Sequence, residues 1–152
     1  MSRHITNIGQ QAPIIALVAD VLLVEDNESD EMLALRTIKL SAPNVRVDVA
    51  RDGVQAVEYL LDPNRECPRL VLLDLKLPLM NGLEVLRKIR TEPKTRRVPV
   101  VCLTSSAEPP DLFGCYDSGA NSYVTKATAY EDYTARMQKL VEYWLTVNEP
   151  CT

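Results

Sequence analysis

Four short apolar runs in the chain each lead directly into a residue with a functional side chain. The runs cover residues 21–24, 70–73, 98–103 and 122–125, and they lead into Glu25 with Asp26, Asp74, Thr104 and Lys126, in that order. Near-continuous apolar runs of this length are typical of strands that a parallel sheet buries on both faces. We therefore predict four buried strands.

A fifth stretch has a different pattern. Val45, Val47 and Val49 alternate with polar neighbours such as Arg46 and Asp48. Side chains alternate between the two faces of a strand, so this period of two predicts a strand that is wetted on one face. We expect it near an edge of the sheet.

Segments with helical spacing separate the strands. Three of them begin at residues suited to capping, namely Asn27, Asp52 and Asn81. The first has Met32, Leu35 and Ile38 on one face, and the second carries Val54, Val57, Leu60 and Leu61. The third has Val85, Leu86 and Ile89 facing inward. The spacing predicts amphipathic helices.

The last two helices differ in strength. Pro109 and Pro110 stand at the start of the fourth helix and Gly114 lies in its middle, which predicts a weak helix. In the final helix, Thr128 and Glu131 have the spacing of a capping box. Strand and helix thus alternate five times, which favours right-handed βαβ units and an α/β, doubly wound parallel sheet.

The 152 residues are enough for one domain with a full core. We expect an N-terminal tail over residues 1–18, a domain over 19–147, a C-terminal tail over 148–152, and no output domain. The connection over residues 62–68, which contains two prolines, should lie on the surface.

Composition excludes several classes of protein. The net charge of −4 argues against nucleic acid as a partner, because binding to the phosphate backbone needs a basic face. No apolar stretch approaches the roughly 18–20 residues that cross a membrane. The four cysteines show no CxxC spacing and favour reduced thiols in a cytoplasmic protein; they are Cys67, Cys102, Cys115 and Cys151.

The residues that follow the strands predict a magnesium site. Ligands bind beyond the carboxyl ends of the strands in an open parallel sheet, so these side chains should converge at one edge. Glu25, Asp26 and Asp74 would supply the oxygen ligands that Mg²⁺ prefers, and Lys126 would compensate their repulsion. Taken singly, the acidic pair would be solvated, Asp74 would be a turn residue and Lys126 a surface lysine. Their coincidence favours a site.

This series of residues at these spacings resembles the receiver domain of two-component response regulators over about residues 20–147. The segments VLLVEDNESD, LVLLDLKLP, VCLTSS, NSYVTKA and VEYWLTV resemble most closely the single-domain regulators paired with cyanobacterial phytochromes. The resemblance implies a flavodoxin-like sheet with strand order 2-1-3-4-5. It also implies a sensor histidine kinase, suspected to be of the phytochrome type, as the partner.

The resemblance implies roles for individual residues. Asp74 would accept the phosphoryl group, with Asp26 and Asp74 binding Mg²⁺ directly. Glu25 would act through a bound water, and the main-chain carbonyl of Lys76 would complete the protein's ligands. Lys126 would neutralise charge on the transferred group.

Other residues would hold the group and respond to it. The hydroxyl of Thr104 and the main-chain N–H of Ser105 would bind the phosphoryl oxygens, together with Lys126. Tyr123 would change orientation when Thr104 moves, or else would simply be an aromatic residue on an edge strand.

Two positions depart from the pattern. Ala127 stands where most similar receivers have proline, often after a cis bond, so the bond after Lys126 is expected to be trans and the loop slightly re-routed. Lys76 is also unusual. Its side chain would either lean over the phosphoryl group or face water.

Phosphate must come from outside the chain. His4 is the only histidine, so we expect no internal phosphohistidine relay, and the donor would be another protein or a small molecule such as acetyl phosphate.

Output would use the surface. The apolar residues of the final helix span roughly 200°, more than one contact with a sheet needs. We expect a homodimer through the fourth helix, fifth strand and fifth helix, with Tyr143 and Leu145 at its interface. The alternative is a wide amphipathic helix with exposed tyrosines.

Two other functions compete with this one. An aspartate-nucleophile phosphatase would share the sheet and the acyl-phosphate chemistry, but it would usually have a second aspartate where Lys76 stands. A phosphate-independent, receiver-like interaction module would be expected to lack a member of the acidic pocket, and none is missing.

Overall fold

The computed structural model describes residues 19–105 and 108–151. Within these ranges five parallel strands form one sheet in the order β2-β1-β3-β4-β5. This confirms the predicted α/β, doubly wound fold and its flavodoxin-like order. The predicted tail over residues 1–18, with His4, lies outside the described residues.

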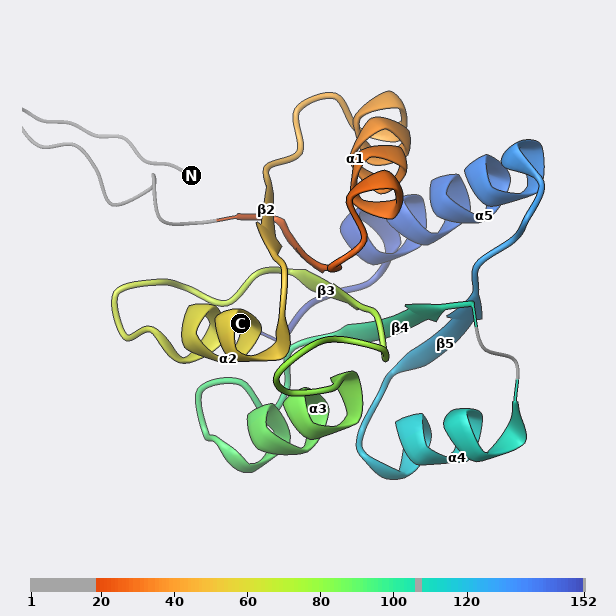
Figure 1. Ribbon diagram of the computed structural model, residues 1–152. Helices are drawn as coiled ribbons and strands as arrows, with labels where there is room; N and C mark the ends of the chain where they lie inside the picture. Colours follow the sequence, from red (N-terminus) through yellow and green to blue (C-terminus); the bar gives the residue numbers. More distant parts are fainter. Residues whose placement is uncertain (1–18, 106–107, 152) are drawn as a thin grey trace, which may run out of the picture.

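Helices and strands alternate along the chain (Figure 1). The strands are β1 (Val21–Val24), β2 (Val47–Ala50), β3 (Leu70–Leu73), β4 (Val100–Thr104) and β5 (Ser122–Thr125). The helices are α1 (Glu28–Ser41), α2 (Gly53–Leu61), α3 (Gly82–Thr91), α4 (Pro109–Asp117) and α5 (Tyr130–Glu142), which continues into a π-helical turn, η2 (Tyr143–Val147). The alternating stretch is β2, at the predicted edge.

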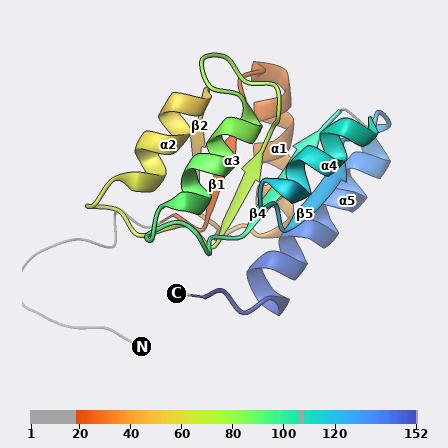
Figure 2. The same cartoon turned by 90° about the horizontal axis from the view of Figure 1, so that it is seen from below.

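The helices cover both faces of the sheet. Helices α1 and α5 lie on one face and α2, α3 and α4 on the other (Figures 1 and 2). Each face has its own core cluster, and the strand residues divide between the two clusters by alternation: Val21 and Leu23 face one, Leu22 and Val24 the other. The continuous apolar runs are therefore needed to bury both faces.

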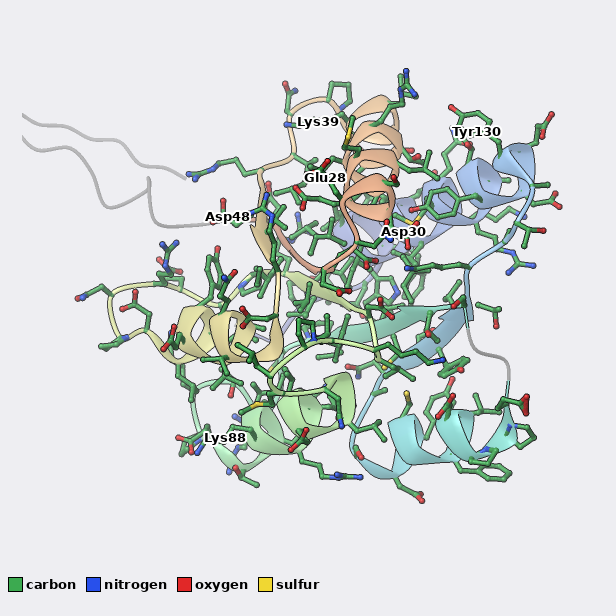
Figure 3. All side chains as sticks on the ribbon, viewed as in Figure 1. Glu28, Asp30, Lys39, Asp48, Lys88 and Tyr130 are labelled. Carbon is green, nitrogen blue, oxygen red and sulfur yellow. The ribbon has the colours of Figure 1, made fainter. Side chains whose placement is uncertain are left out.

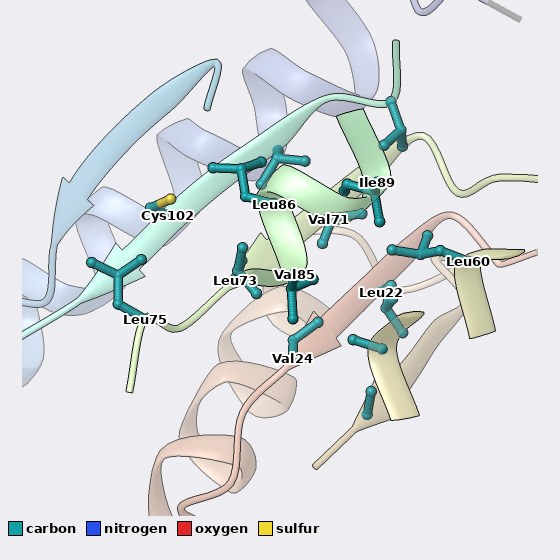
Figure 4. Packing of buried hydrophobic residues seen from close by; sticks show 14 of the residues in the cluster. Leu22, Val24, Leu60, Val71, Leu73, Leu75, Val85, Leu86, Ile89 and Cys102 are labelled. Atoms are coloured by element: carbon teal, nitrogen blue, oxygen red, sulfur yellow. The ribbon is translucent and has the colours of Figure 1, made fainter. Parts of the chain in front are cut away.

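Helix α3 packs across the central strands (Figure 4). Val85, Leu86 and Ile89 are fully buried, as predicted, and they lie over Leu73 and its neighbours. Burying a side chain of this size contributes about 1.5–3 kcal/mol. The packing fixes the position of α3, which begins after the loop that follows Asp74.

Three sequence expectations about the helices are wrong. Met32 is 65% exposed, because the inward face of α1 is formed by Ala34, Thr37 and Ile38. Helix α5 begins at Tyr130 after Ala129, without a side-chain cap, so Thr128 and Glu131 form no capping box.

Leu145, expected at the margin of the last helix's apolar arc, is instead 8% exposed. The π-helical turn changes the angle between successive side chains, and Leu145 packs in the core cluster with Met137 and Val141.

The predicted caps at the first three helices are confirmed. Asn27 accepts a hydrogen bond from the N–H of Asp30, and Asp52 accepts one from Gln55. Asn81 forms a full capping box with Glu84.

Glycine is required at the start of α3. A Cβ on Gly82 would lie 2.5 Å from the carbonyl oxygen of Asp74, well inside van der Waals contact. The N–H of Gly82 also donates to the carbonyl of Leu75. The start of α3 is therefore in direct backbone contact with the residues that follow β3.

We predict that Gly82→Ala destabilises the fold by about 1–3 kcal/mol, because the new methyl group meets backbone that cannot swing aside. Asn81→Ala is the matched control: it loses a cap worth about 1 kcal/mol but adds no atom beside Asp74. Urea unfolding gives both free energies. Only Gly82→Ala should also weaken Mg²⁺ binding, and wild-type stability and Mg²⁺ affinity in that variant would contradict the contact.

Candidate functional site

Three carboxylates meet at the carboxyl edge of the sheet. Glu25 and Asp26 follow β1, and Asp74 follows β3. Val24 and Leu73 are paired in the register of these strands, so the residues after them lie side by side. One oxygen from each carboxylate lies within 4.8 Å of the others. The structure thus brings together the three predicted acidic residues.

The three carboxylates have different environments. Glu25 is only 3% exposed, Asp74 is partly buried and Asp26 is exposed. Burial raises the pKa of Glu25 to about 7; the hydrogen bond from Lys126 lowers it and the charge of Asp74 raises it further. The N–H of Asn27 also donates to Glu25, at 3.2 Å. Burial and the neighbouring carboxylate of Asp74 therefore disfavour the ionised form of Glu25.

Lys126 lies at the centre of the site. Its Nζ is 2.8 Å from Oε1 of Glu25, 3.0 Å from Oδ2 of Asp30 and 3.8 Å from Oδ2 of Asp74. Burial by itself would lower the pKa of Lys126, but the hydrogen bonds that its ammonium donates to Glu25 and Asp30, together with the charge of Asp74, hold it above its ordinary value. The ammonium group is therefore charged and shared among carboxylates.

The bond between Lys126 and Ala127, which stands where similar receivers often have a cis proline bond, is trans. The main-chain N–H of Lys126 donates to the carbonyl of Thr104 at 2.7 Å. This bond ties the end of β5 to the end of β4, so the side chain reaches the acidic residues without a cis bond.

Sequence reasoning missed Asp30. It lies in the first turn of α1, at the end of the helix that faces the carboxyl edge of the sheet (Figure 3). Its carboxylate pairs with Lys126, while its N–H is capped by Asn27. The available signal was an acidic residue three positions after a cap that follows the first strand.

Thr104 and Tyr123 lie on neighbouring strands. Thr104 ends β4 fully buried, and in the register it pairs with Thr125, one residue before Lys126. Tyr123 is half-buried and packs against the core cluster on the α2–α4 side. Ser105 is exposed directly after β4. Thr104 and Lys126 are thus held at the same end of the sheet by the register of two strands.

The loop after Asp74 runs past the site towards α3. The N–H of Lys76 donates to Oδ1 of Asp74 at 3.4 Å, and the residue is exposed. Leu79 has φ of 69°, in the left-handed region that non-glycine residues rarely adopt, and it is 80% exposed. The predicted use of the Lys76 carbonyl as a metal ligand stays a prediction.

An aromatic pair on η2, Tyr143 and Trp144, lies beside the outer surface of β5 and α5. Tyr143 is 47% exposed and its ring meets that of Trp144 edge to face, with centroids 5.0 Å apart. Both line an open hollow of about 490 Å³ with Val124 and Leu140. Leu145 points instead into the domain's own core, so it is unavailable as an interface residue.

The donor set fits a hard divalent cation. Mg²⁺ takes oxygen ligands, keeps several waters and usually uses one or two carboxylates directly. Asp26 and Asp74 are reachable from solvent, and the buried Glu25 stands behind them. Within the described residues, no other group of three or more His, Cys, Asp or Glu side chains is placed to hold a metal.

The chain is similar in sequence to known proteins. The response regulator receiver domain matches residues 21–138. Response regulator Rcp1 of Synechocystis sp. is 36% identical over 135 residues, which cover 86% of this chain and 92% of Rcp1. The probable methanogenesis regulatory protein FilR2 of Methanothrix harundinacea is 40% identical over 131 residues, covering 84% of each chain.

Solved structures of similar proteins share the fold. The phosphorylated cyanobacterial phytochrome response regulator RcpA has a TM-score of 0.82 at 34% identity, covering 88% of this chain and 99% of RcpA. The Mn²⁺-bound form of Rcp1 has a TM-score of 0.81 at 34% identity, covering 89% and 99%.

The described residues contain no helix long and apolar enough to span a bilayer.

The match of the receiver domain to residues 21–138 and the 36% identity to Rcp1 show that the chain belongs to the response regulator receiver family, whose members are in general signalling proteins.

Proposed function

We propose that this chain is a single-domain response regulator, with its receiver domain over residues 19–147, and that Asp74 accepts a phosphoryl group from a phosphohistidine of a sensor kinase. The observation that carries the proposal is the position of Asp74, partly exposed beside two more carboxylates and 3.8 Å from the ammonium of Lys126. No enzymatic turnover is proposed beyond slow self-catalysed transfer and hydrolysis.

Asp26 and Asp74 would bind Mg²⁺ directly, with Glu25 acting through a water and the Lys76 carbonyl completing the protein's share. The Mn²⁺ in the similar Rcp1 supports a divalent cation here. When bound, the ion would neutralise charge on the phosphoryl oxygens. It would also offset the repulsion among the three carboxylates.

The transfer itself forms one bond and breaks another. A carboxylate oxygen of Asp74 attacks the phosphorus, and the bond from phosphorus to the histidine nitrogen breaks with its electron pair left on nitrogen. Phosphoryl transfer needs mainly positioning and charge neutralisation. Lys126 supplies a fixed positive charge, because Glu25 and Asp30 hold its side chain beside Asp74.

Thr104 and Ser105 would then hold the new group, through a hydroxyl and a main-chain N–H. Movement of Thr104 would be sensed by Tyr123 on the neighbouring strand. Helix α4 is the next helix after β4, and it has no side-chain cap at its start and Gly114 in its middle, features of a helix that can shift at low cost.

The proposed donor is a phytochrome-type histidine kinase, because both Rcp1 and RcpA are similar over nearly their whole lengths and RcpA is a cyanobacterial phytochrome response regulator. Such a kinase uses ATP, which places the proposed encounter in the cytoplasm. Neither nucleic acid nor membrane is a proposed partner.

The alternative of a phosphate-independent module is less well supported, because the acidic residues, Thr104 and Lys126 are all in place. A phosphatase is disfavoured further. Lys76 is exposed where such enzymes usually have a second aspartate, so its side chain offers no acid for a leaving group.

We also propose homodimerisation through α4, β5 and α5. The exposed Tyr143 and the hollow beside it on β5 and α5 support this surface, whereas Leu145 no longer belongs to it.

Phosphorylation tests the proposal. Incubation with Mg²⁺ and acetyl phosphate should add one phosphoryl group to the intact mass, and Asp74→Asn should add none, because an amide is no useful nucleophile. The variant should be at least as stable as wild type in metal-free buffer, since one of three clustered charges is gone. Asp52→Asn, which keeps a capping side chain far along the chain from β3, is the control and should be phosphorylated normally. Undiminished labelling of Asp74→Asn would overturn the assignment, and continuous rapid release of phosphate would favour a phosphatase.

Metal binding tests the division of roles among the carboxylates. Asp26→Ala should weaken Mg²⁺ binding in calorimetry far more than Glu25→Gln, because only Asp26 is expected to bind the ion directly and the glutamine can still accept from Lys126. Equal losses in the two variants would show that Glu25 is not limited to a water-mediated contact.

Tyr143→Asp tests the dimer. An unpaired charge at a buried interface is unfavourable, so the variant should shift a wild-type dimer towards monomer in sedimentation experiments. Met32→Asp is the control, since Met32 is exposed on α1 and lies outside the proposed surface. Wild type that stays monomeric at tens of micromolar, with and without Mg²⁺ and a phosphate analogue, would remove the dimer hypothesis.

A further inference from the structure

Cys67 and Cys151 line the same small cavity although they are far apart in the sequence. The cavity has a volume of about 70 Å³, and its other lining residues include Lys94, Arg97 and Pro99. Cys67 lies in the connection between α2 and β3, and Cys151 lies in the segment that follows η2. Both segments pass the amino ends of the strands, opposite the acidic residues (Figure 2).

The four cysteines of the chain fall into two pairs with different access to solvent. All are free thiols. Cys102 on β4 and Cys115 on α4 are completely buried. Cys151 is exposed, and Cys67 is half-buried with its Sγ 3.4 Å from the carbonyl oxygen of Lys94. A small oxidant in solution therefore reaches Cys151 first and Cys67 next.

We propose that Cys67 and Cys151 form a reversible disulfide when the protein meets a hydroperoxide. The bond would fasten the segment after η2 to the connection that leads into β3. Nothing in the receiver chemistry uses either residue, and the proposal does not depend on phosphorylation.

The reaction balances in two steps. The Cys151 thiolate attacks one oxygen of the hydroperoxide, so an S–O bond forms, the O–O bond breaks, and the leaving oxygen takes up a proton; with hydrogen peroxide it leaves as water. The Cys67 thiolate then attacks the sulfur of Cys151. The S–S bond forms, the S–O bond breaks, and hydroxide leaves and takes up the proton that Cys67 released. Two thiols and one hydrogen peroxide thus give one disulfide and two waters.

The surroundings suit this order of events. Lys94 and Arg97 line the cavity together with the two thiols. Burial raises the pKa of Cys67, and the charge of Lys94 partly opposes that rise. Cys67 is therefore suited to resolve an oxidised Cys151 rather than to react first. Residues 148–151 lie outside helices and strands, so Cys151 can adjust to the narrow geometry that a disulfide requires.

Peptide mapping tests the bond directly. The reduced full chain, freed of reductant, is treated with hydrogen peroxide and then with N-ethylmaleimide in native buffer. We expect a peptide pair linked through Cys67 and Cys151, an intact mass lower by two hydrogens before alkylation, and full reversal by dithiothreitol. Cys102 and Cys115 should react with maleimide only after unfolding.

Single variants separate the two roles. In Cys67→Ser the sulfenic acid on Cys151 has no resolving thiol, so dimedone should label it more than it labels wild type. In Cys151→Ser no linked peptide should form, and Cys67 should remain a thiol at the same dose of peroxide.

Three results would overturn the proposal. One is equal dimedone labelling of Cys151 in wild type and Cys67→Ser. Another is a disulfide between two copies through Cys151, seen as a doubled mass on a non-reducing gel. The third is a link between Cys102 and Cys115 in place of the proposed one.

Discussion

The mutual repulsion of carboxylates at one edge of the sheet is the constraint on which the site depends. Glu25, Asp26 and Asp74 lie close together because they follow β1 and β3, which are paired in register at this edge. The positive charge of Lys126 offsets this repulsion, and its side chain reaches the carboxylates because β5 ends at the same edge. Strand pairing brings the charges together, and the ion pairs and a bound cation make that arrangement tolerable. The buried apolar strands are therefore a requirement for the chemistry as well as for stability.

The positions of most site residues could be predicted from the sequence because these residues lie at the ends of strands. They are Glu25, Asp26, Asp74, Thr104 and Lys126. An apolar run identifies a strand, the next residue lies at its carboxyl end, and parallel pairing brings such residues together. The same logic could not find Asp30, whose role depends on where α1 lies over the sheet rather than on a strand. It also could not place Leu145, because a π-helical turn alters the angle between successive side chains and no local sequence signal marked it. Thr128 failed as a cap because the helix begins two residues later.

The two edges of the sheet carry different functional groups. The carboxyl edge holds the acidic residues with Lys126, and the loops there carry the residues proposed to bind phosphate. At the amino edge, proline-rich connections close over the core and bring Cys67 beside Cys151. The proposed phosphoryl transfer and the proposed disulfide would therefore act at opposite ends of the same strands.

The loop after Asp74 contains Leu79, which is unusual both in its backbone conformation and in its exposure. A leucine in left-handed backbone is strained, and one that is 80% exposed gains almost nothing from the hydrophobic effect. Glycine would relieve the strain, and a polar side chain would suit water better. The strain at Leu79 therefore lowers the stability of the isolated domain. A protein that docked over Asp74 would cover the leucine, and that burial would turn an unfavourable local feature into part of the binding energy.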